Sequence, residues 1–344
     1  MAHIQETLVK NIEDNFLVDD VEFILLDYNS TDGLEEWVKT LSKYIDMGIL
    51  TYYRTTIPEN YHRSHSRNMA FRLSNAEIVC NLDADNFLGQ GFADYVFNEF
   101  DKHGTRKIFL TSNFSLRDTL GKFCASQNDF MQIKGYNESL SGYGVEDIDL
   151  YARFVKMGLK QIIFYEKKFY SVIYHSHQDR ISQEERYKSS ESLYLSHQTP
   201  FLTKFLLLHK NLTCEMGALI NNELCNYNIV RNYSNAIDAK LDYRNRITLD
   251  GAIVKGSWML LDDNISLNVE NTACVFYSGD LMMKYKKVSF YKVTDNKLFD
   301  TFLMRISAAI NYEIRNNQSI INPDGFGKGV VYKNFDYKHP IILD

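Results

Sequence analysis

The sequence of 344 residues predicts an α/β protein with a mostly parallel sheet flanked by helices, joined to an additional small β-rich module. Two observations favour this class. Up to about residue 175, apolar strand-like segments alternate with helix-like segments of about ten residues, which is typical of parallel strands connected by helices. Beyond about residue 198, short apolar runs are broken by Asn, Asp and Gly, which is typical of antiparallel strands.

The elements of the first part follow from the spacing of apolar residues. Between residues 34 and 46 these side chains recur every three or four positions and share one helix face: Leu34, Trp37, Val38, Leu41 and Ile45. The segment 21–27 contains a continuous apolar run at residues 23–26, which predicts a buried strand. By the same reasoning we expect helices at residues 3–15, 34–46, 64–73, 91–100 and 146–157, and strands at residues 21–27, 48–53, 77–83, 107–111 and 162–175.

The second part is expected to contain short strands at residues 205–220, 247–254, 257–261, 265–269 and 273–293. Residues 256–267 have the pattern of an antiparallel hairpin with Asp263 and Asn264 at its turn. The aromatic side chains of this part are expected in its core: Trp258, Phe276 and Tyr277. A helix follows at residues 298–316. We therefore expect an α/β domain at 1–197, an inserted β-rich module at 198–297, and a helix and tail at 298–344 that pack back on the first domain.

Composition excludes several classes of protein. Lys and Arg total 38 against 44 Asp and Glu, a net charge of −6, which disfavours a nucleic-acid binder. No apolar run approaches the roughly 18 residues of a membrane helix, and the N-terminal residues lack the pattern of a signal peptide. We therefore expect a soluble cytoplasmic protein.

The five cysteines are widely spaced and odd in number, and none forms a CxxC pair: Cys80, Cys124, Cys214, Cys225 and Cys274. This pattern favours neither a disulfide framework nor a zinc site. We expect buried, reduced thiols.

The strongest chemical signal is the segment Asn81-Leu-Asp-Ala-Asp-Asn86, which follows an apolar strand. If the chain stays extended, Asp83 and Asp85 point to the same side. Two carboxylates at the carboxyl edge of an α/β sheet suit Mg²⁺ or Mn²⁺ bridging a diphosphate. The alternative is an ordinary turn, because Asp and Asn favour turns.

A second acidic cluster is Gly142-Tyr-Gly-Val-Glu-Asp-Ile-Asp149. The glycines permit a tight loop, and the carboxylates then begin a helix. Acidic residues in a first helical turn also stabilise the helix dipole, which is the structural alternative to a catalytic role.

Two further segments carry chemistry-bearing side chains. Tyr174-His-Ser-His177 follows the last expected strand, and a neutral imidazole there could bind Mn²⁺, although a surface role is the commoner one. Arg63 and Arg67 open the helix before the Asp83 strand and could hold phosphates, the alternative being a solvated basic turn.

Taken in order, these motifs resemble family 2 glycosyltransferases of the GT-A fold. Leu25-Leu-Asp-Tyr-Asn-Ser-Thr-Asp-Gly33 is similar to that family's VVDDGSTDG segment, and Arg67-Asn-Met-Ala70 with Asn81-Leu-Asp-Ala-Asp85 is similar to its RN and LDAD motifs. Gly135-Tyr-Asn-Glu138 and Gly142-Tyr-Gly-Val-Glu-Asp147 resemble a region shared with β-1,4-galactosyltransferases. The resemblance covers about residues 1–180, and the β-rich part has no match of this kind.

The resemblance implies a role for each matched residue. Asp147 would be the general base and Glu146 would orient the acceptor. Asp27 would contact the nucleobase or ribose, and Arg67 would bind the nucleotide. Asp85 would be the main metal ligand, assisted by Asp83 and His175, with His177 as the alternative histidine.

The reaction that the resemblance implies is inverting transfer of a sugar, a hexose, from a nucleotide-diphosphate donor, with UDP as the expected nucleotide and Mn²⁺ or Mg²⁺ as cofactor. The expected acceptor is a hydroxyl of a glycan or of a lipid-linked molecule, as in polysaccharide biosynthesis. Such a protein could associate peripherally with the inner face of the membrane. The alternative is a catalytically weak glycan-binding or assembly protein with a degraded donor site.

One part of the family pattern is missing. The family begins with an apolar strand at the centre of the sheet, whereas Met1 falls in the helix that follows it. A sheet without this strand leaves backbone groups unpaired. Either the chain start is misassigned or truncated, or another segment fills the gap. We favour truncation, and expect the upstream coding sequence to encode another apolar strand of about five or six residues.

Overall fold

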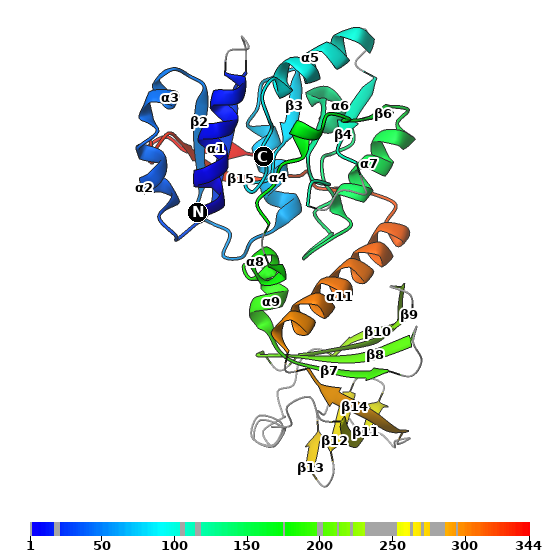
Figure 1. Ribbon diagram of the computed structural model, residues 1–344. Coiled ribbons are helices and arrows are strands. Elements are labelled where there is room, and N and C mark those ends of the chain that lie inside the picture. Colours follow the sequence, from blue (N-terminus) through cyan, green and yellow to red (C-terminus); the bar gives the residue numbers. More distant parts are fainter. Residues whose placement is uncertain are drawn as a thin grey trace. The chain divides into compact units, whose positions relative to one another are not determined.

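The computed structural model describes residues 2–16, 21–103, 107–113, 118–174, 176–197, 202–211, 213–220, 223–230, 253–261, 264–269, 272–275, 286–293 and 295–344 (Figure 1). The chain divides into two compact units. The first comprises residues 1–176 and 317–344, and the second comprises residues 177–316.

The first unit contains two four-stranded sheets. One has the order β1 (Phe23–Tyr28), β2 (Leu50–Thr55), β15 (Gly329–Lys333) and β16 (Ile341–Leu343). The other has the order β3 (Ile78–Asn81), β5 (Phe123–Ser126), β4 (Ile108–Thr111) and β6 (Lys160–Ile163). This arrangement confirms the α/β class. The prediction of a mostly parallel sheet is wrong in detail, because β1–β2 and β4–β6 pair in parallel while the other neighbours pair antiparallel.

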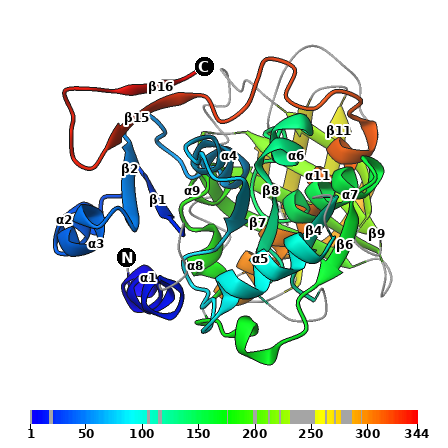
Figure 2. The same cartoon turned by 90° about the horizontal axis from the view of Figure 1, so that it is seen from above.

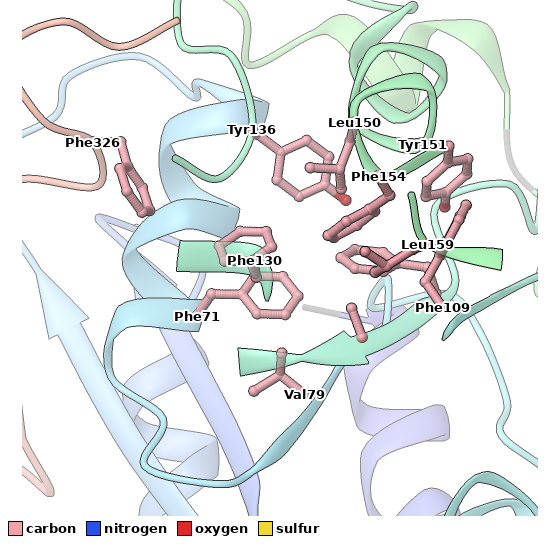
Figure 3. Close-up of a cluster of buried hydrophobic side chains, with 12 residues drawn as sticks. Phe71, Val79, Phe109, Phe130, Tyr136, Leu150, Tyr151, Phe154, Leu159 and Phe326 are labelled. Atoms are coloured by element: carbon pink, nitrogen blue, oxygen red, sulfur yellow. The ribbon is translucent and has the colours of Figure 1, made fainter. Parts of the chain in front are cut away.

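Helices cover both faces of the β3-β5-β4-β6 sheet. Alternate residues of the strands point to opposite faces, so Phe109 packs with α4 (Arg63–Arg72), α6 (Gln127–Gln132) and α7 (Glu146–Lys156). Figure 3 shows this cluster, in which Phe71, Phe130 and Phe154 come from the three helices. Leu110 faces the other way and packs against α5 (Phe92–His103).

The other sheet is covered in the same manner. On one face, Leu50 and Tyr52 pack with α1 (Ala2–Asn15), α2 (Leu34–Lys39) and α3 (Ser42–Asp46), and Figure 2 shows these three helices grouped beside β1 and β2. On the opposite face, Met69 of α4 packs with Val331 of β15. Helix α4 therefore contributes to the cores of both sheets.

Two sequence-based expectations for the first unit are wrong, and two elements were missed. The helix expected at 34–46 is two helices, α2 and α3, separated by Thr40 and Leu41. The hydroxyl of Thr40 donates to the carbonyl of Trp37 where α2 ends. The strand expected at 162–175 stops at Ile163, and the 3₁₀-helix η1 (Lys167–Tyr170) follows. Strand β5 and helix α6 were not predicted.

The second unit consists of one antiparallel sheet and three helices within the described residues. Its helices are α8 (His177–Ile181), α9 (Glu185–Ser189) and α11 (Asn296–Asn317). The sheet has the order β10 (Glu223–Val230), β9 (Cys214–Ile220), β8 (Leu202–His209), β7 (Ser190–His197), β14 (Lys286–Lys292), β11 (Ile253–Leu261), β12 (Asn264–Val269) and β13 (Thr272–Val275).

This sheet confirms the predicted β-rich module. The hairpin is also confirmed, since β11 pairs antiparallel with β12. The expected turn position of Asn264 is wrong, because Asn264 begins β12 and pairs with Leu261. Asp263, Phe276 and Tyr277 lie outside the described residues, as does the side chain of Trp258.

The unit boundaries differ from the expected ones at 197 and 297. Helix α11 and strand β7 group with the β-rich unit, whereas the tail after residue 317 groups with the first unit. Whether the two units are independent domains stays a prediction. Among the described strands, β1 and β3 are edge strands of separate sheets. In the described part of the chain, no helix has both the length and the apolar character needed to span a bilayer.

Candidate active site

The two aspartates of the Asn81–Asn86 segment lie beyond the end of β3. The strand ends at Asn81, and the N–H of Asn86 donates to the carbonyl of Asp83 at 3.0 Å, which closes a turn. Asp83 and Asp85 are therefore not two same-side positions of an extended strand, as the sequence predicted. Each carboxylate has its own surroundings.

Arg67, on α4, lies buried between two carboxylates. Its guanidinium donates to Asp83 Oδ1 at 2.7 Å and to Asp147 Oδ1 at 2.9 Å. The ring of Tyr136 stacks on it, with 5.2 Å between the guanidinium carbon and the ring centroid. Charge-assisted hydrogen bonds shielded from water are stronger than those at a surface. Arg67 thus joins the two acidic motifs that are far apart in the sequence, and its predicted role as a nucleotide ligand stays a prediction.

Asp147 sits in the first turn of α7 and is 7% exposed. Besides the bond from Arg67, it accepts a hydrogen bond from the hydroxyl of Tyr136 at 3.1 Å. Burial raises the pKa of Asp147 to about 7, and the negative charges of Glu146 and Asp83 act in the same direction. A carboxylate with a pKa near neutrality is suited to exchange a proton at physiological pH.

The pKa of Asp83 is shifted in the opposite direction from that of Asp147. The guanidinium of Arg67 outweighs the effect of burial and lowers the pKa of Asp83. One cation therefore serves several carboxylates, since Glu146 Oε1 also lies 3.8 Å from Arg67. Asp83 is the ionised partner of Arg67, and Asp147 is the carboxyl group whose charge is least well compensated.

Glu146 is buried beside Asp147 and lies next to a second arginine. The Nε atom of Arg63 is 3.4 Å from Glu146 Oε1. The Arg63 guanidinium stacks over the rings of Tyr61 and Tyr143, at 5.6 and 5.1 Å from their centroids. The structure therefore brings Glu146, Asp147, Arg67 and Asp83 together in one group.

The backbone that presents Glu146 and Asp147 has an unusual conformation. Val145 immediately precedes α7 with φ of 81°, in the left-handed region that β-branched residues rarely adopt. Its side chain is nevertheless buried. This turn directs the chain so that both carboxylates occupy the first turn of the helix.

Asp27 is the second-last residue of β1 and lies in a different environment. One carboxylate oxygen accepts from the N–H of Ser30 and the other from the hydroxyl of Tyr52, both at 2.7 Å. Arg54 Nε lies 3.8 Å away. These partners belong to β2 and to the turn after β1, whereas the Arg67 group is built from α4, α7 and the end of β3. The predicted contact of Asp27 with a nucleoside stays a prediction.

Asp85 is half-buried and lies beside the segment that leads to His175. Its carboxylate accepts from the side-chain amide of Asn86 at 2.7 Å. Its carbonyl accepts from the N–H of Ile173 at 2.8 Å, and Asn86 pairs antiparallel with Val172. His175 itself lies outside the described residues.

His177, the alternative histidine, begins α8 in the second unit. Its Nδ1 atom is 3.1 Å from the hydroxyl of Thr301. This contact gives His177 a structural partner within its own unit.

Sequence reasoning missed two neighbours of this site. Lys122 is 1% exposed, and its Nζ donates to the carbonyls of Phe87 and Phe169 at 2.7 and 2.6 Å. It ties the loop after Asp85 to η1, and burial lowers its pKa to about 8. A single lysine before an apolar run gives no periodic signal, so the sequence offered no means of finding it.

Gly121 is the second missed residue. A Cβ atom there would lie 2.5 Å from Asp83 Oδ2 and 2.8 Å from Arg67 Nη2. The carbonyl of Gly121 also accepts from the side-chain amide of Asn81 at 2.9 Å. The absence of a side chain at Gly121 is what allows Asp83 and Arg67 to pack against this backbone.

The carboxylate oxygens that follow β3 are chemically suited to bind a divalent cation. Asp83 and Asp85 offer hard carboxylate ligands of the kind that Mg²⁺ and Mn²⁺ bind. Within the residues that the structure describes, no three His, Cys, Asp or Glu side chains are grouped as a metal site. The predicted set therefore consists of two carboxylates and of His175, which is not described.

The fold and the grouped carboxylates together define an α/β protein with an acidic site at the carboxyl end of β3. Comparison with known families then gives two matches. Residues 3–123 match the model of glycosyl transferase family 2, and residues 118–177 match the model described as the N-terminal domain of galactosyltransferase. The resemblance inferred from the sequence motifs is thereby confirmed: the first part of the chain is similar to family 2 glycosyltransferases, and the following segment is similar to galactosyltransferases.

Solved structures of low identity resemble part of the chain. A mannosyltransferase from Pyrobaculum calidifontis in complex with GDP-Man and Mn²⁺ has 19% identity and a TM-score of 0.39, with 49% of this chain and 55% of that chain covered. S. aureus TarS has 15% identity and a TM-score of 0.41, with coverage of 52% and 58%. The chain thus spans little more than half the length of either.

A mutant of Drosophila β-1,4-galactosyltransferase 7, in complex with manganese, UDP-Gal and xylobiose, has 13% identity and a TM-score of 0.33. The match covers 48% of this chain and 76% of that chain. No curated protein sequence matches the chain.

Proposed function

We propose that the protein is an inverting glycosyltransferase that moves a hexose from a nucleotide-diphosphate donor to an acceptor hydroxyl. The observation that carries this proposal is the bridge from Asp83 through Arg67 to Asp147. It joins the acidic segment of the family 2 match to the acidic segment of the galactosyltransferase-like match. A donor held near Asp83 would therefore lie close to a carboxylate able to accept a proton.

Asp147 is the proposed general base. Its raised pKa of about 7 allows it to take the proton of the acceptor hydroxyl as that oxygen attacks the anomeric carbon. The hydroxyl of Tyr136 and the guanidinium of Arg67 hold the carboxylate in one orientation. Glu146, in the same helical turn, is the proposed residue that orients the acceptor.

Donor binding is assigned to Asp27, Arg67 and Asp83. Asp85, Asp83 and His175 are the residues that would hold Mn²⁺ or Mg²⁺. Such an ion would stabilise the negative charge that develops on the departing diphosphate. The hydrogen bonds between Asp85 and the chain at Ile173 support this assignment, because His175 follows two residues later.

The proposed donor is a UDP-sugar, and the proposed acceptor is a glycan or a lipid-linked molecule. This activity would belong to polysaccharide biosynthesis in the cytoplasm, with the protein at the inner face of the membrane when the acceptor is lipid-linked.

One observation favours a second candidate function. No group of three metal-binding side chains is present among the described residues, and Asp83 is already paired with Arg67. A glycan-binding or assembly protein with a degraded donor site would have these properties. It would bind nucleotide without any dependence on metal.

The proposed function is tested by incubating the protein with a panel of UDP- and GDP-sugars in the presence of Mn²⁺ and measuring release of the nucleotide. Wild-type protein should release nucleotide slowly from one of the donors. The release should become faster when a matching acceptor is added. Asp147→Asn should lose the transfer reaction while still binding nucleotide. Asp101→Asn, which changes an exposed carboxylate of α5, is the matched control. Absence of turnover with every donor would refute the proposal.

A further inference from the structure

Two cysteines face each other across the strands that position Asp83. Strands β3 and β5 pair antiparallel, with Cys80 directly opposite Cys124. Their sulfur atoms are 2.7 Å apart, against about 2.0 Å in a disulfide. Opposite residues of antiparallel strands have Cα atoms about 4.5–5.5 Å apart, which is within the range that a disulfide spans. The backbone therefore already holds these thiols in a geometry that a disulfide can adopt.

The two thiols differ in their access to solvent. Cys80 is exposed, which corrects the expectation of buried thiols, whereas Cys124 is completely buried. Cys124 packs in the core with Leu110 and Phe164. An oxidant in solution can therefore reach Cys80 first, and the buried sulfur of Cys124 lies next to it, ready to react in turn.

We propose that Cys80 and Cys124 form a reversible disulfide, a modification site whose oxidant is a hydroperoxide. The Cys80 thiolate attacks one peroxide oxygen, the O–O bond breaks, and a sulfenic acid forms while the other oxygen leaves as water or alcohol. The Cys124 sulfur then attacks Cys80 Sγ, the S–S bond forms, and the sulfenic oxygen leaves as water. With hydrogen peroxide, two thiols and one peroxide give one disulfide and two waters, and two electrons pass from sulfur to oxygen.

Local surroundings agree with this order of events. Burial raises the pKa of Cys124, and its contact with Cys80 adds to the effect. Cys124 thus stays protonated until its neighbour has been oxidised, and it then serves as the resolving thiol. Reactivity in such pairs depends on exposure, and exposure favours Cys80 as the first site.

The disulfide would act on the candidate active site through one residue. Cys80 is followed by Asn81, whose amide donates to Asp83 Oδ1 at 3.2 Å and to the carbonyl of Gly121 at 2.9 Å. The bond would fix the end of β3 to β5, and with it the position of Asn81 beside Asp83. This consequence for activity rests on the proposed function, whereas formation of the bond does not.

The test uses the full chain, reduced with dithiothreitol, desalted and treated with a small excess of hydrogen peroxide. The intact mass should fall by two hydrogen atoms, two of the five cysteines should become unreactive to a thiol reagent, and a non-reduced digest should contain a peptide pair joining Cys80 to Cys124. Dithiothreitol should reverse all three changes.

Matched variants separate this site from the other cysteines. Cys80→Ser, at an exposed position, should keep the fold and lose the mass change, while Cys225→Ser should retain it. Oxygen addition at Cys80 without a crosslink, pairing with another cysteine, or no reaction would each overturn the proposal. Because no substrate is present, these outcomes are independent of whether the proposed transferase activity exists.

Discussion

Asp83 and Asp147 share the guanidinium of Arg67, at 2.7 and 2.9 Å. The two carboxylates titrate in opposite directions, since the pKa of Asp83 is lowered and that of Asp147 is raised to about 7. A single buried cation cannot compensate several buried carboxylates, so one of them holds its proton near neutrality. This relationship gives the site both a lasting negative charge and a proton acceptor.

The pH dependence of transfer should follow Asp147. A general base acts when deprotonated, so kcat/KM should fall about tenfold per pH unit below about pH 7 and level off above it. Steady-state rates between about pH 5 and 9 measure this profile. Asp147→Asn should abolish transfer, and Asp101→Asn should keep the wild-type profile. A rate that is constant from about pH 5 to 7 would contradict the assignment.

Gly121→Ala should disturb the site through one added methyl group. The new Cβ would meet Asp83 Oδ2 at 2.5 Å and force it away from Arg67. We expect a cost of about 1–3 kcal/mol in stability and a loss of about tenfold or more in transfer rate. Thermal unfolding and the transfer assay measure the two effects.

The matched control for Gly121→Ala is Gly217→Ala in the second unit, where the added Cβ would meet the ring of Phe205 at 3.1 Å. This variant should affect stability without the same loss of transfer. Wild-type activity in Gly121→Ala would show that the tight packing against Asp83 has no functional consequence.

Lys122 should make stability depend on alkaline pH. Its pKa is about 8 in the folded protein against the ordinary 10.5, so the unfolded chain binds more protons between these values and stability rises with pH across this window. The neutral amine still has two N–H groups for the carbonyls of Phe87 and Phe169. The full rise corresponds to about 3 kcal/mol.

Urea unfolding of wild type and Lys122→Met at several pH values between about 7 and 10.5 isolates this effect, because other titrating groups are common to both. The free energy difference between the two proteins should shift in favour of wild type as pH rises. A difference that stays constant would mean that Lys122 keeps its ordinary pKa.

Glu215 should make the second unit sensitive to acid. It accepts hydrogen bonds from His209 at 2.8 Å, from Tyr227 at 2.8 Å and from Arg186. Despite burial, His209 and Arg186 lower the pKa of Glu215 to about 2. The stabilisation, about 3 kcal/mol, is fully present above the ordinary value of 4.5 and is lost as pH falls towards 2.

Glu215→Gln should therefore be much less stable than wild type at pH 6. The difference in free energy of unfolding between the two proteins should become smaller at lower pH. Glu223→Gln, at an exposed position of the same unit, should match wild type throughout. Equal urea midpoints for Glu215→Gln and wild type at pH 6 would refute the role of this carboxylate.

The sequence predicted the elements whose apolar pattern is long and regular. Helix α1, strand β1 and helix α7 lie close to their expected bounds, because periodic burial decides their conformation. The expected strand at 162–175 is wrong, because the chain leaves the sheet after Ile163 and forms η1. The carbonyl of Phe169 in η1 accepts from the buried Lys122, a contact that no local pattern encodes.

The candidate site was also predicted only in part from the sequence. Asp83, Asp147 and Arg67 were identified by their motifs, but their mutual contact depends on how α4, α7 and β3 pack. Lys122 and Gly121 act through backbone carbonyls and through the absence of a side chain. Neither property can be read from residue type alone.

The proposed function requires the site to bind a nucleotide diphosphate together with a metal ion held by Asp85. Calorimetric titration of UDP and of GDP, each with and without Mn²⁺, measures this requirement. We predict that Mn²⁺ strengthens binding of one nucleotide by about tenfold or more, and that Asp85→Asn removes this gain. Equal affinity with and without Mn²⁺ for both nucleotides would contradict the account and favour the binding-protein alternative.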